Sequence, residues 1–387
     1  MAKNNNNTRE RVIINTDDLE QIIKILKAKS YTTIGPTLRE KAIIYDEIQG
    51  LNDLPIGLTE KHEAGYYRLE KRDDQAYFGY NVGPQSWKKF LSPPEVKLWS
   101  AKRSENGFDL LEEEPKIQHY AFIGIRSCDL NAIQILDNVF LGGPHTDNIY
   151  GERRRNNFIL AVNCTEAGGT CFCASMGTGP KNEHGFDLAL TEILDKDRHY
   201  FVVDIGTELG KEIIEETSPK KAKSEESELA DKHVEKAANS MGRQLDTERL
   251  HDLLFANFHH PEWKKVADRC LSCANCTMVC PTCFCHTIEE STNLEGNIAD
   301  RTRRWDSCFT LDFSYIHGGS VRKSTKSRYR QWMTHKLASW HDQFGTSGCV
   351  GCGRCITWCP VGIDITEIAN TIRKSGELPE NTVGQPN

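Results

Sequence analysis

Long apolar segments are absent from this sequence. No run of about eighteen apolar residues, the length that a membrane-spanning helix requires, occurs in the 387 residues. The first twenty residues, MAKNNNNTRERVIINTDDLE, also lack the apolar core that follows the basic residues of a secretory signal peptide. We therefore expect a cytoplasmic protein without membrane insertion.

A basic stripe is also missing. Lys and Arg number 48, Asp and Glu number 55, and the two kinds are interspersed, so the formal net charge is a modest -7. Proteins that bind nucleic acids concentrate basic side chains along the path of the phosphates. Nucleic acid is therefore not an expected partner of this chain.

The motifs of common catalytic and nucleotide-binding sites are missing too. The sequence contains no GxGxxG, no GxxxxGK[ST] and no GxSxG, which argues against a dinucleotide, phosphate or acyl-transfer site. No HExxH or similar spacing occurs among the 13 histidines. We therefore interpret the chain as one that has no substrate site of its own and is not an enzyme by itself.

Cysteine, in contrast, is abundant. The chain has fifteen cysteines, an odd number, and they are clustered. A chain of 387 residues can bury apolar cores large enough to fold without disulfides. Because cytoplasmic thiols stay reduced, clustered cysteines predict ligation of a metal or cluster rather than cross-links.

The C-terminal third repeats one cysteine spacing. CLSCANCTMVCP has the spacing C-x2-C-x2-C-x3-C-P, and CVGCGRCITWCP repeats it. In bacterial two-cluster ferredoxins with this spacing, three cysteines of one copy bind one four-iron cluster and the fourth binds the other cluster. We therefore predict two 4Fe-4S clusters, one bound by Cys270, Cys273, Cys276 and Cys359 and the other by Cys349, Cys352, Cys355 and Cys280.

Two other kinds of site use closely spaced cysteines. Zinc sites pair two CxxC motifs across a longer loop instead of placing three ligands at every third position. A thioredoxin-type redox pair requires a surrounding βαβ frame, which the neighbouring sequence does not offer. The repeat therefore favours iron-sulfur clusters over both alternatives.

Two predicted strands in the N-terminal half each lead into a cysteine. Residues 120–125 and 158–162 are continuous apolar runs, typical of strands buried on both faces, and a helix is predicted from Asp129 onward. Cys128 lies where the first strand meets this helix, and Cys164 follows the second strand. If the strands are parallel neighbours, both thiols lie at the sheet edge where open α/β folds bind ligands.

A third cluster is predicted at this edge. Cys171 and Cys173, in the Gly-rich segment NCTEAGGTCFC, join Cys128 and Cys164 to give the four thiols that one more 4Fe-4S cluster needs. The alternative is that Cys128 and Cys164 are small buried apolar residues and that Cys-Phe-Cys is incidental. Asp129 is a further candidate, as an oxygen ligand or as the cap of the helix that starts there.

Three cysteines remain after these assignments: Cys283, Cys285 and Cys308. Three thiols are one short of a four-iron cluster. Inert packing beside the clusters is the first interpretation, and a hydrogen bond to a cluster sulfur or exchange with an assigned ligand stays open.

These patterns predict an α+β protein, with an N-terminal α/β domain followed by a C-terminal helical domain that has a two-cluster ferredoxin-like core. Residues 1–206 form the first domain, from an amphipathic helix in NTDDLEQIIKILKA to a hairpin of FDLALTEI and HYFVVDIG. Residues 207–260, dense in Lys, Glu and Ser, predict a charged, solvated helical linker. Residues 261–375 form the two-cluster domain, with a long insert at 281–348.

The cysteine-containing segments together resemble those of a known family. IRSCDLNAIQILDNVFL, NCTEAGGTCFC, CLSCANCTMVCPTCFC, RRWDSC and CVGCGRCITWCP occur in this order between about Tyr120 and Ile363. They are similar to segments of the iron-sulfur β subunit of cytosolic sulfhydrogenases, the NADP-linked nickel-iron hydrogenases, and of its relative in anaerobic sulfite reductase. The first hundred residues and the segment 210–240 carry little of this likeness.

This resemblance implies an electron-transfer subunit of a cytoplasmic oxidoreductase complex in anaerobic metabolism. It would relay electrons between a partner subunit that holds flavin and NAD(P) and a catalytic partner such as a nickel-iron hydrogenase. An alternative is a subunit of a sulfite- or heterodisulfide-reductase-type complex whose N-terminal cluster contacts a sulfur substrate directly. A third interpretation is a redox sensor whose clusters control binding to another protein, against which only the poverty of DNA-binding features argues.

Overall fold

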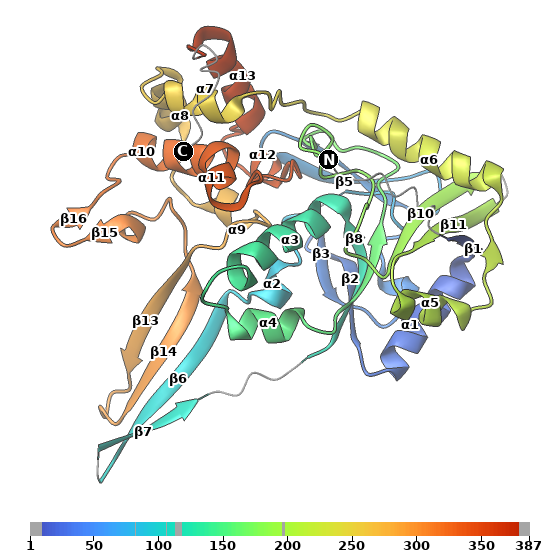
Figure 1. The fold of residues 1–387 in the computed structure, drawn as a ribbon, viewed down its shortest axis with the longest axis horizontal. Helices are drawn as coiled ribbons and strands as arrows, with labels where there is room; N and C mark the ends of the chain where they lie inside the picture. Colours follow the sequence, from blue (N-terminus) through green and yellow to red (C-terminus); the bar gives the residue numbers. More distant parts are fainter. Residues whose placement is uncertain (1–9, 82, 106, 113–117, 196–197, 379–387) are drawn as a thin grey trace.

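The structure, a computed structural model, describes residues 10–81, 83–105, 107–112, 118–195 and 198–378. Its architecture is mixed α+β, as predicted: a large sheet with helices on both faces, a long four-stranded arm, and a group of short helices around the C-terminal cysteines (Figure 1). Among the described residues, no helix is both long and apolar enough to cross a membrane.

A mixed eight-stranded sheet forms the centre of the N-terminal part. The strands predicted at 120–125 and 158–162 are confirmed as parallel neighbours, with Phe122 opposite Ile159. The predicted hairpin is also confirmed, because Leu190 pairs with Val203 in an antiparallel register. The strand order is β12 (Lys220–Lys221), β1 (Arg11–Ile14), β11 (Arg198–Ile205), β10 (Leu188–Asp195), β9 (Phe158–Val162), β8 (Tyr120–Arg126), β2 (Thr32–Arg39) and β3 (Ala42–Glu47).

Helices cover both faces of this sheet because its central strands carry apolar side chains on both sides. Leu160 of β9 packs in the core beneath one pair of helices, and the adjacent Ile159 packs in the core on the opposite face. The first face carries α1 (Thr16–Ala28) and α5 (Glu208–Glu215), and the second carries α2 (Lys88–Leu91), α3 (Ser127–Leu141) and α4 (Asn148–Arg154).

The first helix follows its sequence pattern. The Asn15 side chain caps α1 by accepting a hydrogen bond from the backbone N–H of Asp18 at 3.0 Å, which satisfies one of the free amides at the helix start. The predicted apolar face is buried in the core of the sheet: Leu19, Ile22, Ile23 and Leu26.

The segment predicted as a solvated linker packs on the sheet as far as Asn239. Ile213 and Ile214 of α5 are buried in the core, and β12 pairs with β1. Helix α6 (Ser224–Asn239) packs Ala230 against β10 and β11. The linker interpretation is therefore corrected for these residues: their many charges lie on exposed faces and conceal a few apolar contacts. The domain boundaries stay a prediction.

A four-stranded antiparallel sheet projects from the body as an arm (Figure 1). It combines strands from the N-terminal half with strands from the predicted insert, so the insert is tied to a part of the chain about two hundred residues earlier. The arm contains, in spatial order, β13 (His286–Thr292), β14 (Ile298–Trp305), β6 (Glu95–Ser104) and β7 (Gly107–Glu112).

Short helices surround the C-terminal cysteines and share a separate apolar core, in which Leu253 packs with Trp263 and Met333. The helix predicted within DTERLHDLLFANF is present as α7 (Leu250–Ala256). The other helices are α8 (Glu262–Arg269), α9 (Asn275–Met278), α10 (Thr325–Thr334), α11 (Trp340–Phe344), α12 (Arg354–Thr357) and α13 (Ile365–Ser375), with a π-helical turn at His335–Ser339. Two small hairpins complete the fold: β4 (Leu58–Glu63) with β5 (Tyr66–Lys71), and β15 (Tyr315–Ile316) with β16 (Gly319–Ser320).

Candidate iron-sulfur sites

The two copies of the cysteine motif have matching backbones. Between the cysteines, Ser272 and Ala274 have φ values of 52° and 64°, and Gly351 and Gly353 have 63° and 75° at the equivalent positions. This left-handed region favours glycine. Only the second copy has glycine at these positions. At Gly353 glycine is needed because a Cβ would clash with the backbone of Thr170.

One cavity gathers the first predicted quartet. Most of its other lining residues are apolar, including Phe309 and Trp332. Three of its cysteines lie on the first motif and the fourth comes from the end of the second motif, which is the crossed arrangement that the ferredoxin spacing predicts. The cysteines that line it as the predicted quartet are Cys270, Cys273, Cys276 and Cys359.

A second cavity gathers the other ferredoxin-like quartet. Phe172, Val350 and Trp332 supply apolar walls, and the buried Lys336 supplies a cation. Here the single cysteine from the first motif joins three from the second. The four cysteines are Cys280, Cys349, Cys352 and Cys355.

A third cavity lies at the edge of the large sheet. Cys128 is in the first turn of α3, which begins at Ser127, and Cys164 follows the end of β9. The loop after β9 brings Cys171 and Cys173 to the same cavity. The structure thus brings together all four thiols predicted for the N-terminal cluster, and their binding of a cluster stays a prediction.

Asp129 does not line this cavity, and neither sequence interpretation of it is right. Both its oxygens accept hydrogen bonds from the Arg354 guanidinium, at 2.8 and 2.7 Å, and the Tyr45 hydroxyl lies 3.3 Å away. Both charged side chains are almost completely buried. Asp129 therefore joins α3 to the second cysteine motif, because Arg354 lies between Cys352 and Cys355.

The donor chemistry of the cavities fits 4Fe-4S clusters. Burial, reinforced by neighbouring thiols, raises the pKa of Cys173 and of Cys355 well above the usual value. Such thiols stay protonated at neutral pH unless bound iron displaces the protons. Within the described part of the chain, no three Cys, His, Asp or Glu side chains converge as a single metal ion requires. The quartets are thus too widely spaced for one zinc ion, whereas a cubane cluster presents a separate iron to each thiolate.

A buried cation accompanies the third cavity. Arg126 is 3% exposed, and its guanidinium donates to the carbonyl oxygens of Phe78 and Tyr80 at 2.8 and 2.6 Å. One of its nitrogens lies 3.8 Å from Cys164 Sγ. Although burial alone lowers the pKa of Arg126, the neighbouring Cys164 and Tyr80 raise it overall. The carbonyls and the tyrosine are uncharged at neutral pH, and the Glu60 carboxyl also acts on Arg126. An anionic cluster at this cavity would further balance the buried charge.

Lys336 plays the equivalent part at the second cavity. This side chain lies on the π-helical turn, is 3% exposed, and donates to Thr282 Oγ1 at 2.9 Å and to the Gly348 carbonyl at 3.4 Å. Burial lowers its pKa, but Cys280, Cys283 and Cys349 raise it well above the usual value overall. Lys336 is therefore a fixed positive charge beside the sulfurs of this quartet.

Replacing Lys336 with Met should lower the reduction potential of the cluster at the second cavity. Reduction adds an electron to an anionic cluster, and the buried cation stabilises that extra charge. We expect a fall of about 60 mV or more, since 59 mV corresponds to a tenfold change for one electron. Redox titration followed by electron paramagnetic resonance measures it. The matched control is K265M on α8, where the side chain is 70% exposed; an equal shift in both variants contradicts the assignment.

The loop that carries Cys171 and Cys173 docks directly on the second cysteine motif. The Phe172 N–H donates to the Gly351 carbonyl at 2.8 Å, and the Thr178 hydroxyl donates to the Val350 carbonyl at 2.7 Å. Thr170 and Thr357 share a hydrogen bond of 2.7 Å between their hydroxyls. The N-terminal part and the ferredoxin-like part are thereby held together at the cysteines.

The three cavities form a series. Cys355 lines both the first and the second cavity. Cys352 lines both the second and the third. The cavity of Cys280, Cys349, Cys352 and Cys355 is thus the middle one, and we call the other two the outer cavity (with Cys270) and the N-terminal cavity (with Cys128).

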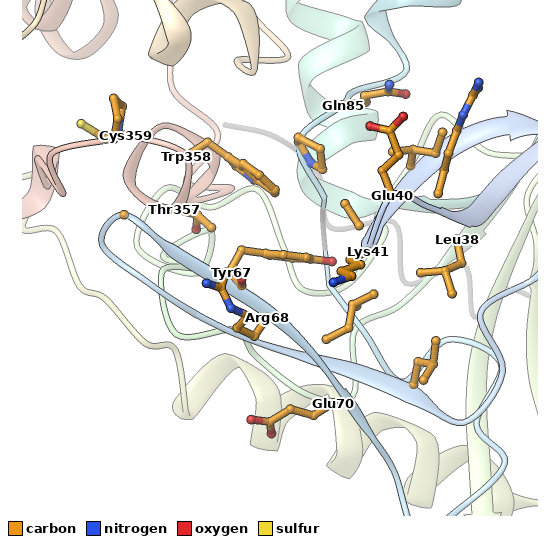
Figure 2. Close-up of a pocket in the computed structure, with 18 of the residues that line it drawn as sticks. Leu38, Glu40, Lys41, Tyr67, Arg68, Glu70, Gln85, Thr357, Trp358 and Cys359 are labelled. Atoms are coloured by element: carbon orange, nitrogen blue, oxygen red, sulfur yellow. Dashed lines mark hydrogen bonds between the residues drawn. The ribbon is translucent and has the colours of Figure 1, made fainter.

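A wide groove runs along the surface beside the outer cavity (Figure 2). Its wall contains Tyr67 and Trp358, whose ring centroids are 5.0 Å apart, and Cys359 adjoins Trp358. Cys273, another member of this quartet, is exposed. The outer cavity is therefore the one closest to solvent on this side of the molecule.

The sequence did not predict the buried cations Arg126, Lys336 and Arg354. The sequence contains an indication for two of them, because they adjoin predicted ligands: Arg126 immediately precedes Ser-Cys-Asp and Arg354 lies inside Cys-Gly-Arg-Cys. Lys336 lies in an ordinary helical stretch with no cysteine within ten residues, so only the three-dimensional structure identifies it. Cys283, one of the unassigned cysteines, shares a hydrogen bond with Cys280, and its role beside the clusters stays a prediction.

Comparison with known proteins agrees with this chemistry. A family model described as a 4Fe-4S dicluster domain matches residues 269–363. Sulfhydrogenase 2 subunit beta of Pyrococcus furiosus is 33% identical over 313 residues, which cover 80% of this chain and 89% of that protein. No solved structure matches the chain. The chain is therefore an iron-sulfur electron-transfer subunit with 4Fe-4S clusters, and it belongs to the sulfhydrogenase beta-subunit family.

Proposed function

We propose that this chain relays electrons through three 4Fe-4S clusters in series, within a cytoplasmic oxidoreductase complex. The observation that carries the proposal is the series of three cavities: each contains a quartet of thiols, and the middle cavity shares one of its cysteines with each of the other two. A cluster of this type carries one electron at a time, and neighbouring clusters pass it on. The middle cluster would connect the two ends.

The proposed ligands follow the three quartets. When bound, each cluster supplies a one-electron redox couple, and the chain supplies the thiolates, the buried cations and the exclusion of water. The outer cluster is assigned to Cys270, Cys273, Cys276 and Cys359, the middle cluster to Cys280, Cys349, Cys352 and Cys355, and the N-terminal cluster to Cys128, Cys164, Cys171 and Cys173.

The partners we propose are a flavin- and NAD(P)-binding protein and a catalytic protein such as a nickel-iron hydrogenase. The groove beside Cys359 suits the docking of one of them, because it borders the outer quartet. Its rim is charged, with four cations and two anions: Arg39, Lys41, Arg68, Lys71, Glu40 and Glu70. Such a rim favours an acidic docking surface and gives an association rate that falls as salt is added.

The alternative, in which the N-terminal cluster binds a sulfur substrate directly, has less support. Besides Cys352, which is assigned to the middle cluster, four thiols line that cavity, and four thiolates occupy all four irons of a cluster, so no iron is left for a substrate. Cys128, Cys171 and Cys173 are also buried. A relay requires neither an open iron nor an exposed cluster edge.

The potential of the N-terminal cluster should depend on pH through Glu60. Burial is the main cause that raises the pKa of Glu60 to about 7. Its carboxylate accepts a hydrogen bond from the Asn81 N–H at 2.9 Å. His62 lies 4.0 Å away and is neutral at pH 7, since burial lowers its pKa to about 4. Arg126 and Glu166 are the charged groups that act on Glu60.

The sign of this dependence is fixed by the charge of Glu60. Below pH 7 the carboxyl is neutral, and above it the carboxylate acts on the Cys164 and Cys171 sulfurs. A nearby negative charge disfavours adding an electron, so the potential falls between pH 6 and pH 8 by something of the order of tens of millivolts. Redox titrations at several pH values measure it. E60Q should abolish the dependence, and an unchanged slope in E60Q contradicts the prediction.

Purification of the native complex tests the proposed function. We expect the chain to be isolated anaerobically together with a flavoprotein and a catalytic protein, and NAD(P)H or the substrate of the catalytic protein should then reduce its clusters. Charge reversal of Arg68 and Lys71 should slow reduction by one partner only. Isolation of the chain without partners from its native source would argue strongly against the relay.

A further inference from the structure

The structure pairs two of the three cysteines that belong to no quartet. Cys285 precedes β13 and Cys308 follows β14 closely, so the base of the arm brings together two residues that are 23 positions apart. The Asp306 N–H donates to the Cys285 carbonyl at 2.8 Å, which extends the strand pairing to this point. The Cys285 sulfur shares a side-chain hydrogen bond with the Cys308 thiol and also accepts one from the Cys308 backbone N–H.

This pair does not form a site for a single metal ion within the described residues. The remaining cysteine, Cys283, is bonded to Cys280 instead of joining the pair. Over the described ranges, no third Cys, His, Asp or Glu side chain converges on Cys285 and Cys308 as a metal ion requires. Two thiols in contact, without further ligands, have the composition of a dithiol that can close to a disulfide.

The pair lies near residues of both the outer and the middle quartets. Cys308 interacts electrostatically with Cys276 of the outer quartet. Lys336, which contacts the middle quartet at Cys280, acts on both Cys285 and Cys308. Both members of the pair are half-buried, so they remain accessible to protons and small reagents. Their position places a thiol pair beside the electron path that the quartets define.

We propose that Cys285 and Cys308 form a dithiol–disulfide couple that exchanges two electrons with the neighbouring clusters. In the reducing direction, two electrons arrive one after the other from reduced clusters, two protons arrive from solvent, the S–S bond breaks and two thiols form. In the opposite direction, two oxidised clusters each accept one electron, two protons leave and the S–S bond forms. No other reactant is needed, because the clusters supply and accept the electrons.

The environments of the two sulfurs shift their pKa values in opposite directions, as is useful for a dithiol–disulfide couple. The hydrogen bond from Cys308 is the main cause that lowers the pKa of Cys285 to about 7, assisted by Lys336 and opposed by burial. The bond from Cys285 and burial raise the pKa of Cys308. At neutral pH the Cys285 sulfur is therefore divided between thiol and thiolate while the Cys308 sulfur stays a thiol, an asymmetry that favours opening and closing of the bond.

The consequence is a two-electron store within a chain of one-electron carriers. It goes beyond the proposed relay and depends on it only in that clusters supply the electrons. A flavin or a hydride donor delivers electrons in pairs, whereas each cluster passes them singly. A store at the junction of two clusters would hold the second electron of a pair until the next carrier is free.

Coulometric titration of the intact, anaerobically purified complex tests this inference. With redox mediators, the wild-type complex should take up two more electrons per copy of this chain than C285S or C308S. This difference in electron uptake does not depend on how many clusters the chain holds. The test of the cysteine pair is therefore separate from the test of the cluster count. C283S, which replaces the third unassigned cysteine, should take up as many electrons as the wild type.

Chemical labelling provides the second readout. After mild oxidation, alkylation and proteolysis of the wild type, mass spectrometry should find the Cys285 and Cys308 peptides joined, and after reduction it should find both alkylated. Equal electron uptake in wild type and variants overturns the inference. Loss of about four irons in C285S or C308S also overturns it, because these cysteines would then be cluster ligands.

Discussion

Replacing Cys349 with Ala in the complete complex is expected to stop electron transfer between the two partner proteins. Cys349 lines the middle cavity and neither the outer nor the N-terminal cavity, so its loss removes the cluster that connects the two ends of the series. We expect the rate to fall by more than about a hundredfold, beyond the 10- to 100-fold that loss of an outer-shell partner costs a metal site. Steady-state transfer from NAD(P)H to the catalytic partner measures the effect.

The linear order makes this result specific. In C349A each partner should still reduce the cluster nearest to it, so the outer and N-terminal signals persist in electron paramagnetic resonance while transfer between them is lost. C283S is the comparison variant: Cys283 is hydrogen-bonded to Cys280 but belongs to no quartet, so its replacement should slow transfer by no more than about 10- to 100-fold. Transfer at the wild-type rate in C349A would contradict the series, and loss of all cluster signals would show that the variant has unfolded.

Replacing Asp129 with Ala is expected to destabilise the chain strongly while leaving every proposed cluster ligand in place. Asp129 and Arg354 form a two-pronged ion pair, with side chains 1% and 0% exposed. Removing one partner leaves an uncompensated buried charge, which costs about 3–5 kcal/mol of unfolding free energy. Because the pair joins α3 to the second cysteine motif, we expect the N-terminal and ferredoxin-like parts to loosen together.

Denaturant unfolding under anaerobic conditions measures this loss. The denaturant concentration at the midpoint should be lower, whether unfolding is followed by the signal of the sheet or by that of the clusters. D268A is the matched control: Asp268 pairs with Lys264 on the exposed surface of α8, with side chains 62% and 73% exposed, and such pairs contribute at most about 1 kcal/mol. A double variant, D129L with R354M, should recover part of the loss because it removes both charges. Equal midpoints for D129A and D268A would contradict the role assigned to the buried pair.

The sequence was most informative where ligand spacing is local. The repeated C-x2-C-x2-C-x3-C-P predicted both ferredoxin-like quartets, because a tight loop and a distant fourth cysteine are required by the cluster itself. Prediction of the N-terminal quartet also required an inference about how two strands are arranged. Cys128 and Cys164 could be placed together only after 120–125 and 158–162 had been interpreted as parallel neighbours, which the structure confirms.

Other features depend on contacts that no local pattern carries. Strands β6 and β7 pair with an insert about two hundred residues away, and neither segment alone indicates its partner. Asp129 was interpreted as a ligand or a cap because its neighbours in sequence are Cys128 and a helix, whereas its true partner is Arg354. The sequence of helix α6 predicts a solvated linker because its charges outnumber the few side chains, such as Ala230, that it buries.

The number of irons per chain tests the central claim most directly. Iron and acid-labile sulfide are measured on the anaerobically purified complex, with the metal content of each partner protein determined separately and subtracted. Three clusters in series predict about twelve irons per copy of this chain, and C171A combined with C173A should lower that value by about four. About eight irons in the wild type, unchanged in the double variant, would show that the N-terminal thiols hold no cluster and that the relay ends at the middle one.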